Sequence, residues 1–150
     1  MMFEETLRQV LEKDEGIVCA IYEDQMVPPN ATCGIGHLLT ETDREYSWPV
    51  GTEISEARVT QLYNQDVGVA LKDARWLHPD FDDLPDPARI VIASLSFQLG
   101  LPRYQRFKLH HAAIDARDWP EAAAQLRDSK LYRQTTNRTE RHATRLESIA

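Results

Sequence analysis

The side chains best suited to chemistry lie in one stretch near the N-terminus, residues 14–40. They are two carboxyls, a hydroxyl and an imidazole: Glu15, Asp24, Thr32 and His37. Glu15 precedes Gly16, and glycine commonly ends helices by adopting the left-handed conformation. A carboxyl group at a helix C-terminus faces the negative end of the helix dipole, so it tends to keep its proton. Such a group can act as a general acid, and the stretch therefore predicts a site for acid–base chemistry.

The elements that position these residues follow from local patterns. Apolar residues recur at helical spacing from Phe3 to Leu11, which predicts an amphipathic helix over residues 2–13. Residues 17–22 are apolar and rich in β-branched side chains, which favours a strand with Asp24 at its end. The prolines after Asp24 require a loop. A return strand over residues 32–36 has two glycines that permit close approach by a neighbouring segment or a ligand. We expect residues 37–40 to lead away into a polar loop.

The rest of the chain reads as helical. Ser55 is a good N-cap for a long helix over residues 56–75, and residues 88–99 are apolar nearly all round, as in a buried helix. Shorter helices are expected later, at residues 106–116, from Trp119 to Leu126, and at 137–148. The fold class predicted is α+β, mainly α, in one domain. A small N-terminal lobe with a short β-sheet (about 14–55) is joined by the long helix (about 56–75) to a helical C-terminal lobe (about 76–150), on which helix 2–13 packs.

Composition excludes several classes of protein. The 150 residues carry a net charge of −7, divided into −11 for residues 1–100 and +4 for residues 101–150. An acidic chain argues against nucleic-acid binding. The basic last third could attract an anionic polymer, although solvation of the surface explains it equally well. No apolar stretch is long enough to span a membrane, so we expect no stable membrane association. The N-terminus lacks the features of a secretory signal, which predicts synthesis in the cytoplasm.

Cysteine and histidine usage predicts no metal and no cofactor. Cys19 and Cys33 lack metal-ligand spacing, and we favour two buried free thiols, with a cross-strand disulfide as the alternative. The pair His110-His111 has no nearby cysteine, and we interpret it as a surface feature and not as a metal site.

Several blocks of sequence resemble the phage-type lysozymes, of which the T-even phage enzymes are the best known. The first blocks are Asp14-Glu15-Gly16, Tyr22-x-Asp24 and Thr32-x-Gly-Ile-Gly-His-Leu-Leu-Thr40. The likeness continues in Leu62-Tyr-Asn-Gln-Asp-Val67, Phe97-Gln-Leu-Gly100, Trp119-Pro-Glu-Ala-Ala123 and Ser129-x-x-Tyr-x-Gln-Thr-x-Asn-Arg138. The blocks stand in the family's order and cover most of the chain.

The resemblance implies a muramidase that hydrolyses the bond between N-acetylmuramic acid and N-acetylglucosamine in bacterial peptidoglycan. Glu15 would protonate the leaving oxygen, Asp24 would stabilise the positive transition state or activate water, and Thr32 would position that water. An acid and a carboxylate on opposite sides of the bond are what glycosidases require, and the family inverts the anomeric carbon. The same resemblance implies further roles. Residues of the sugar cleft would be Leu38, Phe97, His110 and Gln125. Structural support would come from the pair His37 and Asp66 and from Arg138, which reaches the catalytic glutamate in the family.

The chain departs from the T-even pattern between Asp24 and Thr32. Seven residues intervene where that pattern has five, and Pro28-Pro29 replaces the turn glycine. Two alternatives follow: a lytic transglycosylase on the same fold, which needs Glu15 alone, and a non-catalytic module that binds glycan or protein. For the leading hypothesis we expect a monomeric phage or prophage endolysin, or a related lysozyme. It would reach the cell wall in the periplasm after holin-type release or injection.

Overall fold

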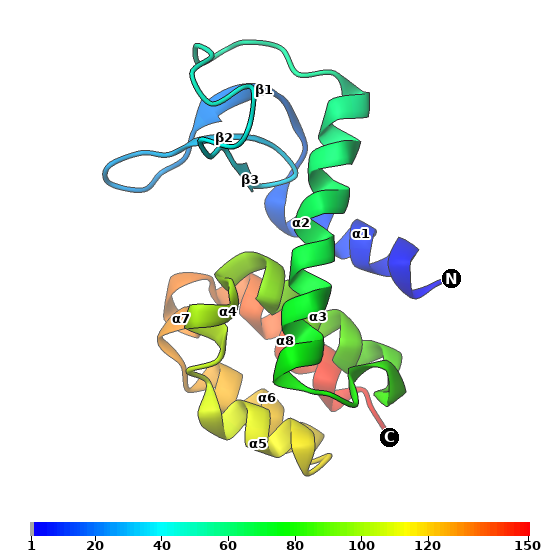
Figure 1. Cartoon of the computed structure of the whole chain (residues 1–150). Coiled ribbons are helices and arrows are strands. Elements are labelled where there is room, and N and C mark those ends of the chain that lie inside the picture. Colours follow the sequence, from blue (N-terminus) through cyan, green and yellow to red (C-terminus); the bar gives the residue numbers. More distant parts are fainter. Residues whose placement is uncertain (1) are drawn as a thin grey trace. The chain divides into compact units, whose positions relative to one another are not determined.

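The computed structural model describes residues 2–150 and divides the chain into two compact units. One unit is Arg8–Gly68. The other is Val69–Ala150 together with the chain up to Leu7. Two helices contribute to both units, α1 (Phe3–Glu15) and α2 (Glu56–Leu77). The expected α+β fold, mainly helical with a small N-terminal sheet, is confirmed (Figure 1).

The unit Arg8–Gly68 contains a three-stranded antiparallel sheet in the order β1-β2-β3 (Figure 1). Its strands are β1 (Val18–Glu23), β2 (Ala31–Gly34) and β3 (His37–Leu38). In the second pairing Cys33 is opposite His37, and Thr32 is opposite Leu38. The prediction that residues 37–40 leave directly into a loop was therefore wrong, because His37 and Leu38 turn back and pair with β2. The turn between the two strands contains Gly36, whose φ of 61° is a conformation that favours glycine.

The core of this unit joins the sheet to the two helices. Ile21, Leu11 and Leu62 are almost completely buried there, with exposed fractions of 0–1%. Gly34 at the end of β2 lies against α2, where a Cβ would stand 3.4 Å from a methyl carbon of Val59. The absence of a side chain at Gly34 therefore lets the strand approach the helix.

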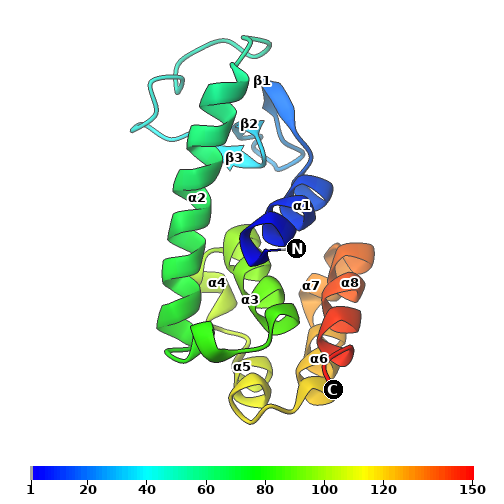
Figure 2. The same cartoon turned by 90° about the vertical axis from the view of Figure 1, so that its right-hand side faces the viewer.

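The second unit is helical and surrounds α3 (Asp86–Leu99), whose residues Ile90 to Ser96 are all buried. Pro87 lies in its first turn, as predicted for a helix start. The remaining elements are short: η1 (Phe81–Asp83), α4 (Leu101–Tyr104), α5 (Lys108–Asp115), α6 (Trp119–Arg127), α7 (Lys130–Gln134) and α8 (Thr136–Glu147). Helix α6 packs against both α5 and α8 (Figure 2). Within residues 2–150, no helix combines the length and apolar character that a membrane span requires.

Two predictions about side-chain environment need correction. Cys33 is buried but Cys19 is exposed, and both are free, so only one of the two expected buried thiols is found. His110 is 1% exposed and His111 is partly buried, so this pair is not the surface feature that the sequence suggested. Both rings are held by hydrogen bonds that connect α5 to other parts of the helical unit.

Candidate active site

Glu15 occupies the C-terminal residue of α1, and its carboxyl group lies against the turn between β2 and β3. Gly16 follows with a φ of 76°, which ends the helix in the predicted left-handed conformation. A Cβ placed on Gly36 would stand 2.7 Å from Oε2 of Glu15 and 3.1 Å from its Cβ. No L side chain fits in that space without displacing the glutamate. The second glycine of Gly34-Ile35-Gly36 therefore makes room for the candidate acid.

Asp24 follows β1 directly, and its carboxylate closes the proline-containing loop. Oδ1 accepts hydrogen bonds from the backbone N–H groups of Met26 at 3.0 Å and Asn30 at 2.9 Å. Oδ2 accepts a third, from Nδ2 of Asn30 at 3.0 Å. These hydrogen bonds, above all the one from the Asn30 backbone, hold the pKa of Asp24 below its usual value. Asp24 is therefore a carboxylate anion at neutral pH. Its hydrogen bonds to Met26 and Asn30 also fix the loop that follows β1.

Thr32 lies in β2, between Tyr22 on one side and Leu38 on the other. Its hydroxyl donates to the carbonyl oxygen of Asn30 at 3.2 Å, and only 6% of the residue is exposed. A hydroxyl that donates one hydrogen bond keeps lone pairs with which it can accept another. Thr32 can therefore accept a hydrogen bond from a water molecule without giving up its contact with the loop.

Tyr22, on β1, has a phenol group that is influenced by the charges of both candidate carboxyls. Burial raises the pKa of the Tyr22 phenol, and the negative charges of Glu15 and Asp24 raise it further. Both carboxyls therefore lie near one phenol group in the same compact unit. Sequence reasoning quoted Tyr22 as part of a motif but gave it no role. In the sequence, the role of Tyr22 was indicated only by its position between the two candidate carboxyls, Glu15 before it and Asp24 after it.

His37 is buried in β3 and has a carboxylate at each ring nitrogen. Nδ1 lies 2.6 Å from Oδ2 of Asp66 in α2, and Nε2 lies 2.8 Å from Oδ2 of Asp43. Burial alone would lower the pKa of His37, but the hydrogen bonds to the two carboxylates outweigh it and raise that pKa. Asp43 was missed, although it also accepts from the backbone N–H of Thr40 and so fixes the loop after β3. His37 thus connects β3 to α2 through Asp66, and it connects β3 to the following loop through Asp43.

The residues expected to contact sugar lie in both units. Leu38 belongs to β3 and is 49% exposed. Phe97 is partly buried in α3, and Arg138 is partly buried in α8. His110 and Gln125 belong to α5 and α6.

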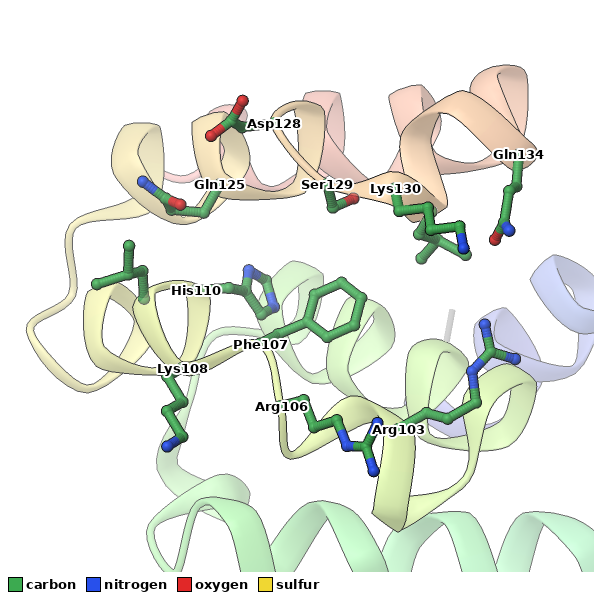
Figure 3. Close-up of a pocket in the computed structure, with 12 residues that line it drawn as sticks. Arg103, Arg106, Phe107, Lys108, His110, Gln125, Asp128, Ser129, Lys130 and Gln134 are labelled. Atoms are coloured by element: carbon green, nitrogen blue, oxygen red, sulfur yellow. The ribbon is translucent and has the colours of Figure 1, made fainter.

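A pocket of about 560 Å³ lies within the helical unit, and both His110 and Gln125 line it (Figure 3). Both ring nitrogens of His110 are already used, by the Tyr104 hydroxyl at 2.8 Å and the Ala122 carbonyl at 3.0 Å. Full burial lowers the pKa of His110 to about 3, so its ring is neutral. The charged residues of the lining are four cations and one acid: Arg103, Arg106, Lys108, Lys130 and Asp128. The pocket is therefore suited to an anionic group, with His110 supplying a neutral wall.

The relatives found by comparison with known proteins include two T4-type lysozymes. The chain is 28% identical to probable T4-type lysozyme 2 and 25% identical to probable T4-type lysozyme 1, both of Dictyostelium discoideum. Each match covers 91% of this chain and 90% of the relative. No protein-family model matches the chain. The resemblance to T4-type lysozymes expected from the sequence blocks is thereby confirmed over nearly the whole length.

Proposed function

We propose that the chain is a lysozyme-like glycoside hydrolase, a muramidase that cleaves the β-1,4 bond between N-acetylmuramic acid and N-acetylglucosamine in bacterial peptidoglycan. One observation carries the proposal: the carboxyl of Glu15, at the end of α1, lies against Gly36 in the unit that also holds Asp24 as an anion. Similarity to T4-type lysozymes along most of the chain supports the same reaction.

In the proposed reaction Glu15 gives its proton to the glycosidic oxygen as the carbon–oxygen bond breaks. Positive charge develops on the anomeric carbon, and the carboxylate of Asp24 stabilises it. A water molecule, hydrogen-bonded to the oxygen of Thr32, attacks the opposite face of the sugar and passes a proton to Asp24. Attack from that face inverts the anomeric configuration. Asp24 then releases its proton to solvent and Glu15 regains one from solvent, which completes the cycle.

Substrate contacts are proposed for both units. Leu38 offers an exposed apolar surface beside Thr32, suited to the face of a sugar ring. Phe97, His110 and Gln125 would contact the glycan from the helical unit. The cations of the pocket would attract the carboxylates that peptidoglycan carries on its peptide stems.

A lytic transglycosylase is the second candidate, and one observation favours it. The carboxylate of Asp24 already accepts three hydrogen bonds from its own loop, which makes it a weak base. A transglycosylase needs no base for water, because a hydroxyl of the muramic acid itself attacks the anomeric carbon. Glu15 alone would suffice for that reaction.

The test is digestion of purified peptidoglycan, with products identified by mass spectrometry. Glu15→Gln is expected to abolish release of muropeptides, while Glu4→Gln, on the exposed first turn of α1, should retain it. Products from a hydrolase are heavier than 1,6-anhydro products by one water. Asp24→Asn should disable a hydrolase and spare a transglycosylase. Undiminished activity in Glu15→Gln would refute both reactions.

A further inference from the structure

A chain of hydrogen-bonded side chains in the helical unit takes no part in the proposed reaction. Its outer end is Asp115, the last residue of α5, whose side chain is 62% exposed. Oδ1 of Asp115 lies 2.8 Å from Nδ1 of His78, and the side chain of His78 is completely buried. Nε2 of His78 lies 2.8 Å from Nδ1 of His111, and Nε2 of His111 lies 2.8 Å from the carbonyl oxygen of Tyr104. One buried and one partly buried imidazole thus connect a surface carboxylate to a backbone carbonyl.

The carbonyl oxygen of Tyr104, at the end of the chain opposite Asp115, determines which atom donates in each hydrogen bond. The carbonyl of Tyr104 can only accept, so Nε2 of His111 carries a hydrogen. A neutral His111 then accepts at Nδ1, and His78 must donate from Nε2. This tautomer of His78 leaves the lone pair of Nδ1 facing the carboxylate of Asp115. In this neutral form of His78 two acceptors would face each other at 2.8 Å, so either a proton on Nδ1 or a metal ion must join them.

A second carboxylate stands at the same place. One ligand atom each from His78, Asp80 and Asp115 can be chosen so that all three lie within 4.8 Å of one another. The side chain of Asp80 is 44% exposed, so the group can be reached from solvent. One imidazole nitrogen and two carboxylate oxygens form a ligand set that suits Zn²⁺, with room for water as a fourth ligand. Metal-bound histidines usually donate their other ring N–H to a fixed acceptor, as His78 does toward His111.

We propose that His78, Asp80 and Asp115 form a binding site for a divalent transition-metal ion, of which Zn²⁺ fits best. His111, held by the Tyr104 carbonyl, is the positioning residue that fixes the His78 ring. The proposal differs from the sequence-based expectation of no metal, which rested on Cys19 and Cys33 and on the pair His110-His111. It is independent of peptidoglycan cleavage, because none of its residues belongs to the proposed active site.

Arg117 controls the charge of this site. Its guanidinium donates to Oδ2 of Asp80, and it also donates to the carbonyl of Ile114 at 3.1 Å. Arg117 has a φ of 59°, in the left-handed region that favours glycine. The guanidinium and a metal ion would compete for the same carboxylate. Arg117→Gly, which removes the competitor and suits the backbone, is therefore expected to tighten metal binding.

The experiment is titration of the full chain, freed of metal by chelator and dialysis, with Zn²⁺ in an isothermal calorimeter. We expect one Zn²⁺ per chain and a rise in melting temperature with Zn²⁺ concentration. Asp80→Asn and Asp115→Asn alter exposed side chains and should fold, and each is expected to weaken binding by at least about tenfold. Asp83→Asn changes an exposed aspartate of the short helix η1, which follows Asp80, so it is the matched control and should bind as wild type. Long-range ¹H–¹⁵N spectra should show the largest change at Nδ1 of His78.

Three results would overturn the proposal. The first is the absence of heat and of any melting shift at millimolar Zn²⁺, which would mean that a proton alone joins His78 to Asp115. The second is unchanged Zn²⁺ binding when Asp80→Asn and Asp115→Asn are combined, which would place the metal elsewhere. The third is weaker binding in Arg117→Gly, which would exclude Asp80 as a ligand. None of these measurements depends on enzymatic activity.

Discussion

Replacing Gly36 with alanine tests whether the close packing of Glu15 against the turn matters for catalysis. The added methyl would stand 2.7 Å from Oε2, 3.0 Å from Cδ and 3.1 Å from Cβ of Glu15. Rotation of the carboxyl group can relieve the first contact, but the Cβ of Glu15 is fixed by α1. Glu15 must therefore move as a whole, or the turn must open.

Two separate effects are expected. Alanine at a φ of 61° costs about 1–2 kcal/mol of folding free energy, because its Cβ crowds the backbone in the left-handed region. That strain is expected to lower the stability of the fold without changing catalysis. Rotation and displacement of the acid should also lower kcat/KM, towards the roughly 10²-fold loss that a misplacement of about 1 Å causes. At a temperature where Gly36→Ala is fully folded, the variant should therefore still be much less active than the wild type.

Other glycines of the same unit provide matched controls. Gly34 has the same φ of 61°, but its Cβ would meet Val59 at 3.4 Å and not Glu15. Gly51 has a φ of 92° and nothing within 4 Å of a Cβ. We would measure unfolding in urea for all three alanine variants, and initial rates of peptidoglycan digestion at a temperature where each is folded. Gly34→Ala and Gly51→Ala should lose stability and keep most of their activity.

The reasoning would be refuted if Gly36→Ala lost no more activity than the two controls. The expected pattern is a loss of activity in Gly36→Ala that clearly exceeds the loss in Gly34→Ala and Gly51→Ala.

Three further predictions concern the two units separately. Asp43→Asn should shift the NMR titration of His37 to lower pH. Because the folded-state pKa of His37 is raised, the stability lost in this variant should be largest below about pH 6 and disappear as pH rises through that pKa. Arg58→Ala leaves the fully covered carboxylate of Glu45 without its two hydrogen bonds of 2.7 and 2.9 Å, so unfolding in urea should show a loss of about 3 kcal/mol. Adding Glu45→Gln should restore part of that loss, and no recovery would contradict the reasoning. Arg106→Gln in the pocket should raise KM for peptidoglycan and leave kcat unchanged, whereas a fall in kcat alone would exclude a binding role.

The sequence predicted the parts of the site that depend on local conformation. Gly16 indicated the end of α1 because a left-handed residue ends a helix whatever surrounds it, and this located Glu15. The prolines after Asp24 indicated a loop for a similar reason, since they cannot continue a ladder of backbone hydrogen bonds. The motif around His37 also led to Asp66, although only through the family resemblance.

The parts that escaped prediction depend on contacts between distant residues. Strand β3 has two residues, too few to show an alternating pattern, and it exists because β2 lies beside it. Asp43 is one acidic residue among several in a loop, and only the fold brings it to His37. Asp115 and His78 are 37 residues apart in sequence, and His111 and His78 are 33 apart. Nothing in the spacing indicated that buried rings would connect them.

The loop after β1 determines how the candidate reaction should be understood. The extra residues and the two prolines would leave a long, exposed segment next to the site, but Asp24 holds it with three hydrogen bonds. The same contacts lower the pKa of Asp24. Its side chain is therefore held in the negatively charged form, and it becomes a weaker base. An anion of this kind is better suited to stabilising a positive transition state than to removing a proton from water. In the proposed hydrolysis we therefore expect electrostatic stabilisation to be the main contribution of Asp24, and either proposed reaction would depend on Glu15.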